Sequence, residues 1–114
     1  MDGLWTVEFG SSTGMFGSGV AVFRDGRILG GDNVYYYVGE YILQGSKLKA
    51  TLRISPFIEG SESVFKTIGQ DLTLDLVGAV TSNDSAIAQG HPRGKPELKF
   101  GAKLTKRAPL SGTR

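Results

Sequence analysis

Short stretches in which apolar and polar residues alternate are the feature that most constrains how this chain can fold. In the clearest example every second side chain is apolar and those between are polar or basic: Leu48, Ala50, Leu52 and Ile54 alternate with Lys47, Lys49, Thr51 and Arg53. Successive side chains of a β-strand point to opposite faces, so this stretch is typical of a strand with one face on a core. The pattern predicts a β-protein.

Similar alternation predicts seven further strands. We expect them at residues 5–9, 17–24, 27–31, 34–43, 71–77, 85–90 and 98–104. Asp25-Gly26 is the strongest hairpin signal, since a type I′ turn needs positive φ at both central residues. Pro56 ends the pairing after the fifth strand because it cannot donate to a ladder. Residues 59–70 are expected to form a long loop with local structure.

These elements predict an all-β fold with little helix. A chain of 114 residues fits a single domain, with residues 1–108 forming the barrel and 109–114 a frayed C-terminal tail. Sequential hairpins favour a closed eight-stranded antiparallel up-and-down barrel, although periodicity alone leaves a sandwich open. The predicted core includes Trp5, Phe9, Leu52, Leu74 and Phe100.

Residues suited to catalysis or metal binding are scarce, which predicts a non-enzymatic protein without a cofactor. The chain has no cysteine and a single histidine, His91, which we expect in an exposed loop beside Pro92. The glycine-rich stretch 14–19 is not followed by a helical pattern, so it does not indicate a phosphate site.

Charge and hydropathy indicate the cellular compartment and the class of partner to expect. No apolar run approaches the roughly 20 residues that span a bilayer, and no apolar segment follows a basic start, so we expect a cytoplasmic protein without membrane contact. From Arg93 onward there are seven Lys or Arg residues and one acid, Glu97. Nucleic-acid binding is nevertheless disfavoured, because the tyrosines and the lysines lie on different predicted strands.

The stretch 34–43 is apolar on both faces of its predicted strand. One face holds Val34, Tyr36, Val38 and Ile42, and the other holds Tyr35, Tyr37, Tyr41 and Leu43. Only one face of a barrel strand lies inside, so a partner, a ligand or the 59–70 loop must cover the other. Exposed tyrosines are typical of interfaces, which makes four residues candidates for a homodimer or partner interface: Tyr35, Tyr36, Tyr37 and Tyr41.

A series of motifs is densest in the first forty residues: Asp2-Gly3-Leu4-Trp5, Gly17-Ser18-Gly19-Val20, Asp25-Gly26, Gly30-Gly31-Asp32 and Tyr37-Val38-Gly39. These motifs resemble the GrlR family, whose named members are negative regulators of type III secretion genes in enteric bacteria. The resemblance implies a lipocalin-like barrel that dimerises and sequesters a transcriptional activator. Within it, Gly30, Gly31 and Gly39 are structural, Gly30-Gly31 allowing a bulge or sharp bend, and Asp32 caps backbone N–H groups.

One departure from the family concerns the partner. The enteric members have a run of acidic residues on a surface loop, whereas the corresponding turn here, residues 44–47, has none. Two functions therefore stay open. The first is a regulator that acts through its outer surface, and the second is a barrel that holds a small apolar ligand in its interior. Aromatic side chains should point outward in the first and inward in the second.

Overall fold

A computed structural model describes residues 1–12, 14, 16–58 and 71–110. Strands account for most of this part of the chain and no helix occurs in it. In chain order the strands are β1 (Gly3–Ser11), β2 (Phe16–Arg24), β3 (Arg27–Gly31), β4 (Tyr35–Gln44), β5 (Lys47–Pro56), β6 (Leu72–Ser82), β7 (Ser85–Pro92) and β8 (Phe100–Ala108). The loop predicted at 59–70 and most of the predicted tail, residues 111–114, lie outside the described residues.

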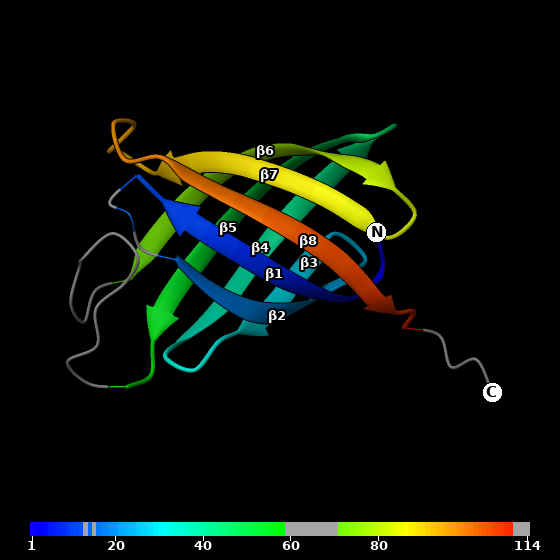
Figure 1. The fold of residues 1–114 in the computed structure, drawn as a ribbon, viewed down its shortest axis with the longest axis horizontal. Helices are drawn as coiled ribbons and strands as arrows, with labels where there is room; N and C mark the ends of the chain where they lie inside the picture. The colour runs from blue at the N-terminus through cyan, green and yellow to red at the C-terminus, as the bar shows by residue number, and fades with distance from the viewer. Residues whose placement is uncertain (13, 15, 59–70, 111–114) are drawn as a thin grey trace.

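The eight strands form one closed antiparallel barrel in which each strand pairs with the next and β8 pairs with β1 (Figure 1). The predicted up-and-down barrel is therefore confirmed, and the sandwich is excluded. Closure removes the sheet edges that an open β-protein would expose.

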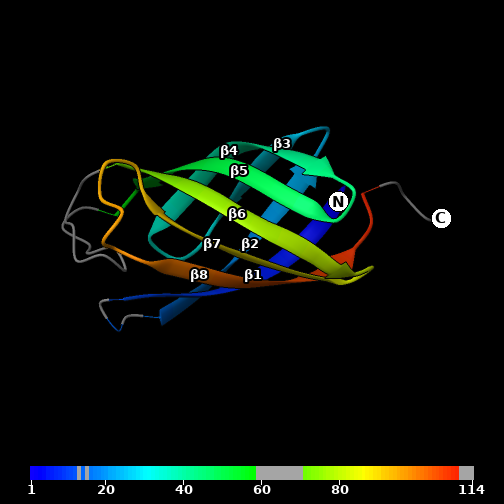
Figure 2. The ribbon, with the colours of Figure 1, turned by 90° about the horizontal axis from the view of Figure 1, so that it is seen from above.

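The barrel has two different ends. At the terminal end, β1 begins, β8 ends and three tight turns join β2 to β3, β4 to β5 and β6 to β7. At the loop end lie the β1–β2 connection, the β3–β4 turn and the connection from β7 to β8 (Figure 2). The Asp25-Gly26 turn has positive φ at both residues, 49° and 80°, as a type I′ hairpin requires.

The core consists of inward-facing side chains from all around the barrel. Trp5 and Leu74 are almost fully buried, and Phe100 is 8% exposed. Phe9 and Leu52, also predicted for the core, are half-buried and pack against it. On β5 the predicted alternation is confirmed for residues 47–54, with the lysines and Arg53 exposed.

Several predicted strand boundaries were wrong, and β6 shows the largest difference. β6 continues through Gly78 to Ser82, where a Cβ at residue 78 would lie 1.9 Å from the Ile87 carbonyl oxygen, so only glycine lets the strands approach so closely. His91 lies in β7 and pairs with Asp75 on β6, not in a loop. Leu98 precedes β8, although it still packs against the core.

The Gly30-Gly31 pair does not form the predicted β-bulge. The β2–β3 and β3–β4 registers pass through both glycines without a shift. A Cβ at Gly30 would lie 2.2 Å from the Val20 carbonyl oxygen, and one at Gly39 would lie 2.3 Å from that of Thr51. Both positions are therefore places where neighbouring strands come too close for a side chain.

Candidate ligand-binding cavity

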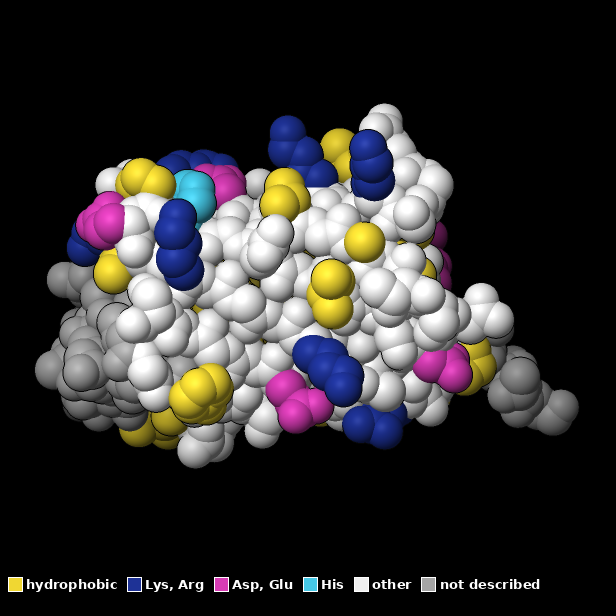
Figure 3. Space-filling view, turned by 45° about the horizontal axis from the view of Figure 1, so that its top comes forward, with side chains coloured by type: hydrophobic (Ala, Val, Ile, Leu, Met, Phe, Trp, Pro, Cys, Tyr) yellow, Lys and Arg dark blue, Asp and Glu magenta, His cyan; other side chains and the backbone are white. Residues whose placement is uncertain are grey.

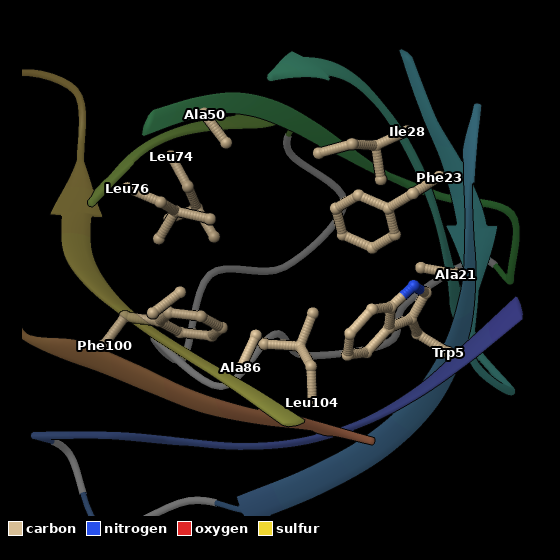
Figure 4. Close-up of a cluster of buried hydrophobic side chains, with 11 residues drawn as sticks. Trp5, Ala21, Phe23, Ile28, Ala50, Leu74, Leu76, Ala86, Phe100 and Leu104 are labelled. Carbon is tan, nitrogen blue, oxygen red and sulfur yellow. The ribbon is translucent and has the colours of Figure 1, made fainter. Parts of the chain in front are cut away.

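Aromatic side chains fill the terminal end of the barrel. The Trp5 and Phe23 rings meet edge to face with centroids 5.9 Å apart, and Phe23 meets Tyr41 in the same way at 5.2 Å. The Trp5 Nε1–H donates to the Met1 carbonyl oxygen at 2.9 Å, so the buried indole has its hydrogen bond. In Figure 4, Leu104 lies between Trp5 and Ala86, and Ala86 on β7 pairs with Leu104 on β8. A separate hollow at this end is bordered by Met1, Trp5, Leu43 and Val80 among other residues.

Toward the loop end the interior holds a cavity of about 210 Å³. Small side chains occupy inward positions where larger ones would fill the space, and the wall includes Ala21, Ala50, Ala88 and Ala102. Phe9 and Phe100 also line it, with ring centroids 5.8 Å apart. The cavity follows from the residue sizes on the inner face, since alanine cannot reach the barrel axis.

Polar groups line the cavity only near the loop end. The β3–β4 turn contributes Asp32 and Asn33, and Tyr35 and Tyr37 follow on β4. The Asp32 carboxylate accepts hydrogen bonds at Oδ1 from the backbone N–H groups of Val34 and Tyr35, both at 2.8 Å. Its Oδ2 accepts the Tyr37 hydroxyl. The predicted capping role of Asp32 is confirmed, and the same residue also faces the cavity.

Burial raises the pKa of Tyr37 well above its ordinary value, and the hydrogen bond to the Asp32 carboxylate raises it further. The phenol is therefore a proton donor at any physiological pH. Tyr37 and Asp32 form a fixed polar pair at one end of an apolar chamber.

The four tyrosines predicted for an interface lie on both faces of β4, because successive side chains of a strand alternate between the inside and the outside of the barrel. Tyr35 and Tyr37 are buried inside the barrel, and Tyr41 is half-buried against the core. Tyr35 and Tyr37 are therefore wrong as surface interface residues, whereas the Tyr41 hydroxyl donates to Asp2 at an exposed position. Tyr36 points outward and is 47% exposed, which settles which face of the strand is inward.

The outer face of β1–β4 carries a continuous apolar row, which we call the outer apolar row: Leu4, Val22, Leu29 and Val38. Tyr36 on β4 and Val20 on β2 flank this row, and both are about half exposed. On the side that Figure 3 shows, apolar side chains are instead scattered singly among charged ones. The outer apolar row is thus a feature of one side of the barrel.

The remaining titratable groups do not form a second site. Arg93 donates to both Asp75 carboxylate oxygens, at 2.7 and 3.1 Å, and this contact lowers the Asp75 pKa. The His91 Nδ1 lies 3.0 Å from the Pro92 carbonyl oxygen. Among the described residues no three potential metal ligands come together. The same part of the chain contains no helix that could span a membrane.

Sequence reasoning left an interior ligand site open without locating it, although a signal for its position was present. The alternation identified the inward positions correctly, and the alanines at 50, 88 and 102 could have been compared in size with the leucines beside them. Asp32 was interpreted only as a backbone cap, because its approach to Tyr37 depends on how β3 and β4 turn at the loop end.

No protein-family model matches this chain, and neither does any curated protein. Among solved structures, a redesigned β-barrel is similar over 93% of this chain and 90% of its own, with a TM-score of 0.51 and 11% sequence identity. At that identity the similarity shows the barrel fold alone. The resemblance to the GrlR family therefore stays a prediction.

Proposed function

We propose that the protein binds a small apolar molecule inside its barrel. The observation that supports this most is the cavity of about 210 Å³ bounded by alanine, leucine and phenylalanine side chains. Protein interiors normally contain few voids larger than a water molecule. A ligand that occupies this apolar space would be stabilised by the removal of its apolar surface from water.

The inward aromatic side chains also favour the ligand-binding function over a purely surface function. Three of the four β4 tyrosines face the interior or the core, and Tyr35 and Tyr37 line the cavity. Binding pockets for small molecules are typically apolar with a few convergent polar groups, and this chamber has that composition.

The neutral probe 1-octanol tests this function. Titration into isotopically labelled protein should give saturable amide shifts near Val7, Ala88 and Phe100, and small ones near the packed terminal end. The variant Ala88→Leu should weaken binding at least about tenfold because the added carbons occupy the chamber. Ile87→Ala is the matched control, since Ile87 is the adjacent residue and is 53% exposed. Absence of saturation, or equal binding by Ala88→Leu, contradicts the proposal.

The second candidate is a protein that acts through its outer surface as a homodimer. The outer apolar row and its flanking residues Val20 and Tyr36 support it, since contiguous exposed apolar surface marks interaction sites. Arg27 on β3 and Glu40 on β4 are register partners at the edge of this patch. Each copy therefore presents one positive and one negative side chain, and in a two-fold contact the positive side chain of one copy can face the negative one of the other. Sequestration of a transcriptional activator, which the family resemblance implies, would use the same face.

Light scattering at micromolar concentration tests the dimer. The wild type should have twice the monomer mass, and Tyr36→Lys should be monomeric because it places a charge within the apolar contact. Ile87→Lys introduces the same charge at an exposed apolar residue on β7 and should remain dimeric. A monomeric wild type would rule out this second candidate and leave the first intact.

A further inference from the structure

The cavity differs in polarity along its length. Near its middle the wall is apolar, with Ala50, Ala88 and Leu104 among its residues, and the polar side chains gather at the loop end. Asp32 is the only charged side chain that lines it among the described residues. A molecule that fills such a chamber would place an apolar part inside and a polar group beside Asp32.

The hydrogen bonds of Asp32 define which polar group fits. An ionised carboxylate accepts hydrogen bonds only, at about four lone-pair positions. Val34 and Tyr35 donate to Oδ1, and Tyr37 donates to Oδ2, so by this count one acceptor position on Oδ2 has no donor among the described residues. No lysine or arginine in the described part of the chain forms an ion pair with Asp32. The remaining position therefore requires a donor and favours a positive charge.

We propose that the cavity selects amphiphiles whose polar group donates a hydrogen bond, a primary ammonium first and a hydroxyl second, and disfavours the corresponding carboxylate. This inference rests on the proposed ligand-binding function. A carboxylate ligand would bring a second negative charge beside Asp32 in surroundings of low polarity, where like charges repel strongly.

The charge of the whole protein would favour the opposite order. Formal net charge is +2, and the basic residues cluster from Arg93 onward. Long-range attraction therefore favours an anionic ligand. A preference for the ammonium must consequently come from the local carboxylate, which makes the order of affinities diagnostic.

The volume sets the size of the probes. An apolar cavity of roughly 150 Å³ holds benzene, so this slightly larger chamber suits a short chain or a single substituted ring. Octylamine, 1-octanol and octanoate share one eight-carbon chain and differ only in the polar group. At pH 7 the first is a cation, the second is neutral and the third is an anion.

Calorimetric titration of the three probes into wild-type protein tests the inference. Octylamine should bind at least about tenfold more tightly than octanoate, with 1-octanol between them, because the ionic contact lies in a partly buried site. In Asp32→Asn, which keeps the side-chain shape and removes the charge, the affinities of octylamine and octanoate should approach one another within about threefold. Octanol binding should change little.

Asp84→Asn is the matched control. Asp84 is exposed in the turn between β6 and β7 at the terminal end, so this variant changes the net charge equally without touching the cavity. It should keep the wild-type order of affinities. If Asp32→Asn fails to fold, the order in which wild-type protein binds the three probes still tests the inference.

Two failures can be told apart. If 1-octanol does not bind the wild type, the ligand-binding function itself is wrong. If all three probes bind wild-type protein equally, or if octanoate binds best, ligand binding stands and selection by Asp32 is wrong. Persistence of the octylamine preference in Asp32→Asn would likewise overturn the assignment to this carboxylate.

Discussion

The two ends of the barrel interior are built from the same eight strands and the same alternation, yet they are filled differently. At the terminal end, Trp5, Phe23 and Tyr41 pack edge to face. Toward the loop end, alanines on β5, β7 and β8 leave a chamber beside Asp32 and Tyr37. The comparison indicates that one end supplies the stability and the other offers a binding site.

The two ends also place a tyrosine and an aspartate together in the same way. At the loop end the Tyr37 hydroxyl donates to Asp32, and at the terminal end the Tyr41 hydroxyl donates to Asp2 at 3.1 Å. The first pair lines the cavity and the second is exposed. The same residue types therefore serve a chamber at one end and a surface contact at the other.

The largest expected effect is the loss of the indole at the terminal end. Trp5→Ala should lower the free energy of unfolding by about 3–5 kcal/mol, because it removes a fully buried ring from a packed cluster. Phe9→Ala at the loop end should cost less than half as much, since Phe9 is half-buried and borders the cavity. Urea denaturation measures both. Equal losses would show that the two ends are packed alike.

The sharpest comparison uses two alanines on one strand. Ala86 and Ala88 both face inward from β7, but Ala86 is fully buried opposite Leu104 and only Ala88 lines the cavity. Ala86→Leu should destabilise by about 1–3 kcal/mol because the core there is already full. Ala88→Leu should change stability by less than about 1 kcal/mol, since space is available. If thermal unfolding shows a lower midpoint for Ala88→Leu than for Ala86→Leu, the free space lies beside Ala86 and not beside Ala88.

The sequence predicted the barrel because alternation and turns are local signals. Residues 47–54 show which side chains point inward without any knowledge of neighbours, and Asp25-Gly26 specifies its own turn. The strand ends were harder, because the continuation of β6 through Gly78 depends on how closely β7 approaches. Local patterns therefore determine the strands, and contacts between strands determine their lengths.

The candidate site could not be predicted in the same way. Whether Tyr36 or Tyr37 is inward depends on the register of β4 against β3 and β5, and a shift of one residue exchanges the two faces. The cavity is a property of side chains that meet across the barrel from distant strands, such as Ala50 and Ala102. Neither relation is visible in a single stretch of sequence.

A further comparison concerns the two hydrogen bonds between a tyrosine and an aspartate. Tyr37→Phe at pH 7 should lower stability by about 1.5–3 kcal/mol, the usual range for a hydrogen bond to a charged group. Tyr41→Phe should cost less, because the contact between Tyr41 and Asp2 is exposed to solvent that can replace it.

The loss of stability caused by Tyr37→Phe should also depend on pH, because the buried phenol resists ionisation. Burial and then Asp32 raise the pKa of Tyr37 far above the value near 10 that tyrosine has in an unfolded chain. The unfolded state therefore loses this proton first. The stabilisation that Tyr37 provides is complete below about pH 10 and is lost at higher pH, by at most about 1.4 kcal/mol per pH unit. The stability gap between wild type and Tyr37→Phe, measured by urea denaturation, should therefore narrow by about 1.4 kcal/mol between about pH 10 and pH 11. A gap that stayed constant over that interval would mean that Tyr37 ionises as easily in the folded barrel as outside it, and that the chamber is open to water at its polar end.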